Sequence, residues 1–216
     1  MINKKRYLIT TADEKTWKFD RSVIFLGEWC RLYNRKHIWS GMDALVAEPY
    51  GLKFSKRESD YSKLLSLEKK LFPKFIQLLN HHHNTNYSER FWQILIGPWF
   101  RIMLRDLFYY INSLEYCLSS HEISGTTGYD SNKTFFISDT KDMIEFFNNH
   151  SNLNALYTRI LSLLGNKNFS TDLIPLENKN THKSFKLKAE KNKSKQFYKN
   201  ILKLCFNFYS TISKKF

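Results

Sequence analysis

The chain has few cysteines and no long apolar run, and both absences limit what it can be. Three of its 216 residues are cysteines, and Cys30, Cys117 and Cys205 lie far apart. An odd number of widely spaced cysteines gives no disulfide framework and fits a reducing compartment. No stretch of about 18 uncharged apolar residues occurs, so no membrane-spanning helix is predicted. The apolar run behind the basic start is too short for a secretory signal, and we expect a cytoplasmic protein.

Sequence patterns that bind phosphates, metals or nucleic acids are also missing. There is no GxGxxG and no P-loop sequence. The adjacent residues His81, His82 and His83 point in different directions on a helix, whereas helical ligand pairs stand four residues apart, so they predict a solvated helix end. No helix-turn-helix, RRM or zinc-finger pattern occurs. We therefore expect no metal, no cofactor and no nucleic acid.

Positive charge is in excess. Lysine and arginine number 34 against 20 acidic residues, which gives a formal net charge of +14. Such an excess favours a polyanionic partner, such as the phosphates of a nucleotide-sugar or an anionic membrane surface. It is explained equally well by a composition rich in Lys, Asn, Ile and Phe, as AT-rich genomes encode. Both explanations stay open at this point.

The first fifty residues have the pattern of an α/β protein. Short apolar runs predict strands at residues 7–10, 23–26 and 45–47. The second run has four consecutive apolar residues, which is typical of a parallel strand that is covered on both faces. Residues 29–42 are long enough for a crossover with some helix. The expected fold is a Rossmann-like lobe with a parallel sheet.

Helical periodicity dominates from Asp60 to about Leu114. Apolar residues spaced three and four apart predict an amphipathic helix with a kink or break at Pro73. A second helix, capped by Ser88, is expected to be interrupted at Gly97-Pro98.

Beyond that helical region the sequence is more polar. Residues 119–132 predict a loop, residues 134–138 a short strand, and Ser138-Asp139 the cap of a helix that runs to Phe147. Another helix is predicted from Leu153 to Leu164, ended by Gly165.

We predict a domain over residues 1–165, with a large helical portion, and a basic tail over residues 166–216. The tail is expected to contain a linker and then an amphipathic helix. Such a helix can lie on an anionic membrane, which would make the protein peripheral at the inner membrane. It can equally pack against another domain.

Ionisable residues gather where the second predicted strand ends. Ligands of open α/β sheets bind outside the carboxyl ends of the strands. Glu28 is the first ionisable residue there and is a candidate general base toward a hydroxyl. Arg31, Arg35 and His37 follow as candidate substrate-binding residues. The alternative is that Glu28 caps a helix and the basic residues form a solvated face.

A second group of candidate substrate-binding residues lies in the second predicted helix. Trp99 and Arg101 flank the expected interruption at Gly97-Pro98, which would free backbone groups for a ligand. Tryptophan rings also stack on sugars. For most aromatic residues here core packing is the better explanation, but Arg90 and Arg101 are exceptions, since arginine is rarely buried without a partner.

Several long motifs resemble a known family. They are Tyr7-Leu8-Ile9-Thr10-Thr11-Ala12, Trp17, Phe25-Leu26-Gly27-Glu28-Trp29-Cys30-Arg31-Leu32-Tyr33, Arg35-Lys36-His37-Ile38-Trp39, and Arg90-Phe91-Trp92-Gln93-Ile94-Leu95-Ile96-Gly97-Pro98-Trp99. Together they resemble the start of a family of transferases linked to the synthesis of O-antigen and related surface polysaccharides.

The resemblance implies a two-lobed glycosyltransferase in which the first lobe binds a glycan acceptor and the second binds a nucleotide-sugar donor. Members of the family are longer than this chain. The expectation is therefore that the chain is the acceptor-side lobe, a truncated product or fragment that is incomplete as a catalyst alone. The alternative function is a non-catalytic, basic scaffold at a membrane.

Overall fold

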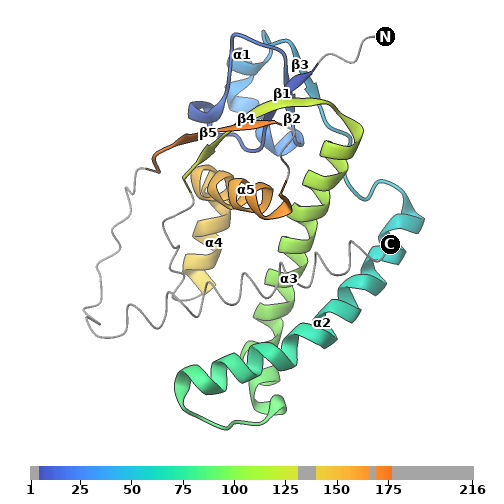
Figure 1. The fold of residues 1–216 in the computed structure, drawn as a ribbon, viewed down its shortest axis with the longest axis vertical. Coiled ribbons are helices and arrows are strands. Elements are labelled where there is room, and N and C mark those ends of the chain that lie inside the picture. The colour runs from blue at the N-terminus through green and yellow to red at the C-terminus, as the bar shows by residue number, and fades with distance from the viewer. Residues whose placement is uncertain (1–4, 131–139, 166–168, 177–216) are drawn as a thin grey trace. The chain divides into compact units, whose positions relative to one another are not determined.

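The computed structural model describes residues 5–130, 140–165 and 169–176 (Figure 1). Its contacts divide the chain into two compact units. Residues 5–50 and 109–176 belong to the first, which we call the sheet unit. Residues 51–108 belong to the second, which we call the hairpin unit. The predicted domain boundary at residue 165 stays a prediction, and the predicted helix of the basic tail lies outside the described residues.

The sheet unit is built on five parallel strands in the order β3-β2-β1-β4-β5. They are β1 (Arg6–Ile9), β2 (Val23–Phe25), β3 (Ala44–Val46), β4 (Ile123–Tyr129) and β5 (Ser170–Ile174). The predicted α/β class, parallel sheet and first three strands are confirmed. Val23, Ile24 and Phe25 are fully buried, as expected for a strand that is covered on both faces.

The strand β4 corrects the prediction of a polar loop at residues 119–132. Its sequence, ISGTTGY, is polar, yet most of the strand is buried. The hydroxyl of Thr126 donates to the carbonyl of Leu8 at 2.8 Å, which removes the cost of burying it. Gly125 lies under the ring of Tyr7, and Gly128 lies against Thr158. A central strand therefore forms from small and hydroxyl side chains because each has a partner or a close neighbour.

Helices and short turns surround the sheet. The β1–β2 and β2–β3 connections contain η1 (Glu14–Thr16), η2 (Glu28–Cys30), η3 (Tyr33–Arg35) and α1 (Lys36–Trp39). After β4 come α4 (Thr140–Asn148) and α5 (His150–Leu164), and α5 packs on β4 (Figure 1). Gly165, at φ 66°, ends α5 as predicted. The predicted strand at residues 134–138 and the predicted cap of α4 lie outside the described residues.

The strand β5 corrects a second prediction. Residues 166–195 were expected to form a linker, but Ser170–Ile174 pair in parallel with Gly125–Tyr129. Four of the five β5 residues are exposed, since the strand lies at the edge of the sheet. The hydrophobic pattern that reveals a buried strand is therefore absent from this sequence.

The hairpin unit consists of two long helices. The helices are α2 (Phe54–His83) and the first part of α3 (Glu89–Ser120). Ser88 caps α3 as predicted, because its hydroxyl accepts the amide of Phe91 at 3.2 Å. Buried residues of the two helices pack together, among them Leu71, Phe75 and Phe100. Within the described residues, no helix combines the length and apolar character that crossing a bilayer requires.

Neither proline ends its helix. The helix α2 continues through Pro73 and α3 continues through Gly97-Pro98, so a break at Pro73 and an interruption at Gly97-Pro98 are both wrong. The alternative at Pro73, a kink, stays a prediction. Each proline removes one amide donor, but the buried residues Phe72 and Phe100 beside them hold both helices in the shared apolar core. Beside Trp99 the helix is therefore continuous, and Pro98 leaves the carbonyl of Ile94 without its usual helical donor.

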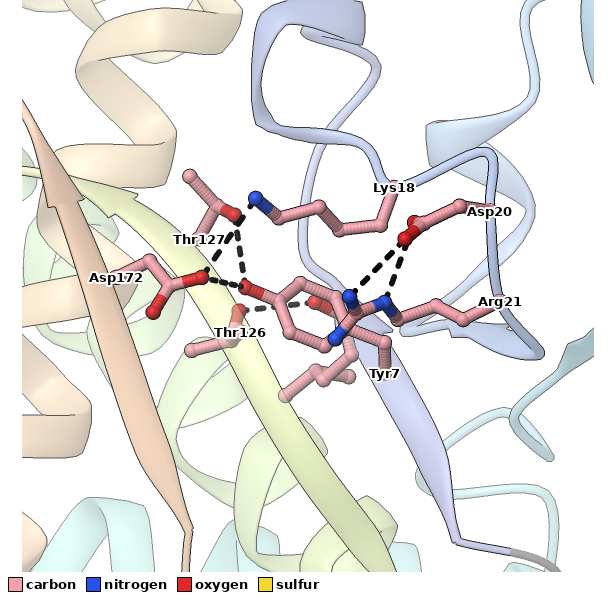
Figure 2. Close-up of polar contacts among 8 residues, drawn as sticks. Tyr7, Lys18, Asp20, Arg21, Thr126, Thr127 and Asp172 are labelled. Carbon is pink, nitrogen blue, oxygen red and sulfur yellow. Dashed lines mark hydrogen bonds and ion pairs between the residues drawn. The ribbon is translucent and has the colours of Figure 1, made fainter.

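The phenol of Tyr7 ties three strands together on the sheet face that points away from α5 (Figure 2). Its hydroxyl lies 2.8 Å from Oγ1 of Thr127 and donates to Oδ2 of Asp172 at 2.9 Å. Lys18 pairs with Asp172 at 3.6 Å, and the guanidinium of Arg21 lies 5.3 Å from the centre of the Tyr7 ring. Burial raises the pKa of Tyr7 to about 12, so the phenol stays protonated and donates to the carboxylate.

Replacing Tyr7 with phenylalanine should lower the free energy of unfolding by about 1 kcal/mol near neutral pH, because two buried hydrogen bonds are lost. The folded pKa lies above the ordinary value of 10.0, so the contribution of the phenol is complete below pH 10 and is lost as the pH rises toward 12. Denaturant unfolding of Tyr7→Phe and wild type should therefore differ less and less over that range. Tyr33→Phe, at an 85% exposed position, is the control and should change nothing.

Gly128→Ala should destabilise the sheet unit by about 2 kcal/mol through overpacking. The added Cβ would lie 2.0 Å from Oγ1 and 2.7 Å from Cγ2 of Thr158, so α5 must move away from β4. Gly41→Ala is a matched control, because no atom lies within 4 Å of its added Cβ. Equal stability of the two variants in chemical denaturation would contradict the packing described for β4.

Candidate functional site

The strand order reverses direction between the neighbouring strands β1 and β4. From β1 the chain proceeds to β2 and β3 on one side, and from β4 it proceeds to β5 on the other. The connections that leave the carboxyl ends of β1 and β4 therefore diverge. In open α/β sheets the space between such diverging connections is where ligands bind.

The side-chain amide of Asn154 fills the position where β1 and β4 separate. Its Oδ1 accepts the backbone amide of Tyr129 at 2.9 Å. Its Nδ2 donates to the carbonyl of Thr127 at 3.2 Å and to the hydroxyl of Thr10 at 3.0 Å. Asn154 is 1% exposed, so the polar groups that it satisfies would otherwise be buried without partners. The amide thereby fixes α5 to the carboxyl ends of both strands.

Two tryptophans fix the segment that follows β1. The indole of Trp29 donates to the carbonyl of Thr10 at 3.1 Å, and that of Trp17 donates to the carbonyl of Thr11 at 3.0 Å. The backbone that leads from β1 into the diverging connections is therefore held from two sides.

A hollow of about 550 Å³ opens beside this segment. Its walls come from the turn after β1, from the η3 region and from the start of α5; the lining residues are Ala12, Asp13, Glu14, Lys15, Leu32, Asn34, Arg35, Asn148, Asn149, His150 and Ser151. We call it the β1–α5 hollow. It lies where the fold predicts a ligand, and it carries two carboxylates, an arginine and a histidine.

Asp13 joins the walls of the β1–α5 hollow. Its Oδ2 accepts the hydroxyl of Tyr129 at 2.8 Å and that of Ser151 at 2.5 Å, while Oδ1 accepts the amide of Lys15 at 3.2 Å. On the opposite wall, Asn149 caps α5 by accepting the amides of Ser151 and Asn152. Asp13 thus connects the end of β1 with the end of β4 and the first turn of α5.

Glu14 and Arg35 form a bidentate ion pair in the same hollow. The two nitrogen–oxygen distances are 2.7 Å and 2.6 Å. The Arg35 guanidinium lowers the pKa of Glu14, so this carboxylate stays charged near neutral pH. The predicted substrate-binding residue Arg35 is therefore placed at the hollow, with its guanidinium bound to Glu14.

Glu28, the predicted base, lies just after β2 at the start of η2. Its carboxylate accepts Nη2 of Arg31 at 2.5 Å and Nε of Arg31 at 3.1 Å. The Glu28 side chain is 68% exposed. It lines a second hollow of about 490 Å³ with Val46, Ala47, Glu48, Pro49, Ser120 and His121, where Glu48 accepts the hydroxyl of Tyr116.

Two further residues near Glu28 in the sequence, His37 and Cys30, differ in exposure. His37 is exposed on α1. Cys30 is buried, and its thiol lies 3.5 Å from the carbonyl of Ile9. Burial raises the pKa of Cys30 to about 12, which keeps the thiol protonated.

The second predicted group lies in the hairpin unit. Trp99 is half-buried and stacks on Phe75 at 6.3 Å, so much of its ring serves the helix–helix core. Arg101 is exposed and makes a bidentate pair with Glu68, from Nη2 to Oε1 at 2.8 Å and from Nε to Oε2 at 3.1 Å. Arg90 is exposed in the first turn of α3. The substrate-binding roles of these three residues stay predictions.

Sequence reasoning missed Asp13 and Asn154, although both lie in or beside the motifs and helices it identified. The only signal was position, because Asp13 follows the first predicted strand and Asn154 lies inside a predicted helix. In the part of the chain that the structure describes, His, Cys, Asp and Glu side chains form no group of three that could hold a metal.

Asn154→Ala should lower the free energy of unfolding by about 3 kcal/mol, because the amide of Tyr129 and the carbonyl of Thr127 would be left buried without partners. Urea unfolding followed by circular dichroism measures the loss. Asn152→Ala, two residues earlier on α5 and half-buried, is the matched control and should cost less than 1 kcal/mol. A small effect at Asn154 would mean that water or other groups satisfy the strand ends.

Comparison with known proteins identifies one family. The sequence model described as LIC12162 family transferase matches residues 6–216, which is nearly the whole chain. No curated protein matches, and no solved structure matches. The match spans both the sheet unit and the hairpin unit.

Proposed function

Because the chain belongs to the LIC12162 family of transferases, we propose that it takes part in transferring a sugar from a nucleotide-sugar to a hydroxyl of a glycan acceptor, in bacterial surface polysaccharide (O-antigen) synthesis. The observation that carries the proposal is the carboxyl edge of the parallel sheet, where the carboxylates of Asp13, Glu14 and Glu28 follow β1 and β2 and line two hollows. Carboxylates bind and orient sugar hydroxyls by accepting their hydrogen bonds.

In the proposed reaction a carboxylate removes the proton of the acceptor hydroxyl. The oxygen then attacks the anomeric carbon of the donor, a new carbon–oxygen bond forms, and the bond to the nucleoside diphosphate breaks. The proton stays on the carboxylate, and the nucleoside diphosphate leaves with the bonding electron pair. Negative charge on the departing diphosphate is stabilised by cationic side chains, and Lys36 is exposed at the start of α1, in the connection after β2.

Glu28 is the base in this proposal, because a general base must be reachable by its substrate. Its side chain is largely exposed, and Arg31 holds both of its oxygens in one orientation. Asp13 already accepts two hydroxyls and one amide, so we assign it a positioning role. Its loss would change the shape of the β1–α5 hollow.

The test is the release of nucleoside diphosphate from a panel of nucleotide-sugars, with a lipid extract of the source organism as acceptor. The expected result is release that depends on one nucleotide-sugar and on the extract. Release from none of the sugars, together with turnover of an acyl, methyl, sulfuryl or phosphoryl donor, would keep the transferase class and reject glycosyl transfer.

Glu28→Gln should reduce kcat at least about 100-fold while leaving the unfolding midpoint unchanged, because the amide cannot take a proton. Glu122→Gln is the control, since Glu122 is also an exposed glutamate of the sheet unit, and it should retain full activity. Asp13→Asn should lower kcat/KM and stability together. Full activity of Glu28→Gln beside an inactive but folded Asp13→Asn would move the base to Asp13.

A further inference from the structure

Two matching rows of exposed residues on the helices of the hairpin unit differ in chemistry. On α2 the exposed residues Ser66, Lys70, Pro73 and Gln77 follow one another at spacings of four, three and four. On α3 the exposed residues at the same spacings are Phe91, Leu95, Pro98 and Ile102. Each row has a proline at its third position, so α2 provides an internal reference for a solvated face. Compared with that polar row, the row on α3 exposes apolar side chains that gain nothing from contact with water.

The α3 row is continuous and strongly exposed. Ile94, beside the row, is 73% exposed, Leu95 62%, and Phe91 and Ile102 about 40% each. The buried face of the same helix, with Trp92, Phe100 and Leu104, already packs in the hairpin core. We call the exposed set Phe91, Ile94, Leu95, Pro98 and Ile102 the α3 stripe. Contiguous apolar surface of this kind marks an interaction site.

The amino-terminal end of the α3 stripe is aromatic. The ring of Tyr87 lies 4.2 Å from that of Phe91, and Tyr87 is 49% exposed. A tyrosine at the end of an apolar surface has one apolar part and one polar tip, which suits the boundary between a bilayer and water.

Three arginines lie on one side of the α3 stripe, and they favour an anionic surface over a second copy of the chain as its partner. At 100° per residue, Arg90, Arg101 and Arg105 lie on the same flank of the helix. Arg101 and Arg105 are 66% and 63% exposed and pair with Glu68 and Asp106. Each guanidinium has five N–H donors, so donors remain for a phosphate beside the paired carboxylate. An antiparallel copy that matched Phe91 with Ile102 would bring Arg90 of one copy near Arg101 of the other, and like charges repel.

An anionic surface attracts the same flank. We propose that the α3 stripe with its arginine flank is a docking surface for an anionic lipid bilayer, with the apolar residues among the acyl chains and the arginines among the lipid phosphates. Amphipathic helices with an apolar face and a basic flank bind membranes in this manner. The proposal stands on the hairpin unit alone and does not depend on glycosyl transfer.

Flotation of the full chain with vesicles tests the proposal. Wild type should float with vesicles of phosphatidylcholine and phosphatidylglycerol, and much less with phosphatidylcholine alone. Ile94→Gln/Leu95→Gln should weaken binding to the anionic vesicles at least about tenfold, since two apolar side chains lose their transfer into lipid. Glutamine is a good helix former and both positions are exposed, so the fold should persist.

Ile144→Gln/Leu163→Gln is the matched control, because these residues are exposed on α4 and α5 of the sheet unit. It should float like wild type. Failure of wild type to float would overturn the proposal. So would unchanged flotation of the Ile94/Leu95 variant, which would place membrane binding elsewhere in the chain. A wild-type dimer in analytical ultracentrifugation that this variant converts to a monomer would assign the stripe to a second copy instead.

A label provides a second readout that adds no polar residue. In a Cys205→Ser background, Ile94→Cys carrying an NBD fluorophore should shift to shorter wavelength and brighten with anionic vesicles, since the buried Cys30 and Cys117 are protected from labelling. The same label at Ser66→Cys, on the polar face of α2, should stay in water. Identical spectra at the two positions would contradict the proposal.

Discussion

The three hydrogen bonds of the Asn154 side-chain amide are the interaction on which the sheet unit depends. Parallel strands satisfy each other's backbone only while they run side by side, and β1 and β4 part at their carboxyl ends. The amide of Asn154 supplies a donor and an acceptor at that point, and it adds a bond to the hydroxyl of Thr10. Because a buried backbone group without a partner is costly, the strands can diverge only where such a side chain is present. The divergence in turn makes room for the β1–α5 hollow.

The chemistry of the site follows from which groups the fold leaves accessible at this edge of the sheet. Asp13 and Glu14 come from the turn after β1, and Arg35 and Glu28 from the connection after β2. Each carboxylate is held by a named partner, so the carboxylates are oriented before any ligand arrives. Preorganised acceptors of this kind suit hydroxyl-rich substrates. This is the structural basis for proposing glycosyl transfer within a family that is identified only as transferases.

Much of the fold could be predicted from the sequence, because β1, β2 and the helices have local apolar patterns. The strand β4 could not, since Thr126 and Thr127 are compatible with burial only through partners on β1 that lie about 120 residues away. The strand β5 is exposed at an edge and has no pattern to detect. The prolines led to wrong predictions of helix ends, because packing of α2 against α3 outweighs the one backbone hydrogen bond that each proline removes. Of the site, Glu28 and Arg35 were identified from their place after a strand, whereas Asp13 gains its role from Tyr129 and Ser151, which are distant in sequence.

The hairpin unit presents a second surface, the α3 stripe, and the matching row of α2 is polar apart from Pro73. The proposed glycosyl transfer, however, requires that substrates bind at the carboxyl edge of the sheet. Hydrogen exchange followed by mass spectrometry, with and without donor and acceptor, tests it most directly. Slower exchange is expected in residues 10–16, 27–37 and 148–152, with no change in residues 19–22, which precede β2 at the amino-terminal edge of the sheet. Unchanged exchange in those three segments, with protection elsewhere in the chain during turnover, would contradict it.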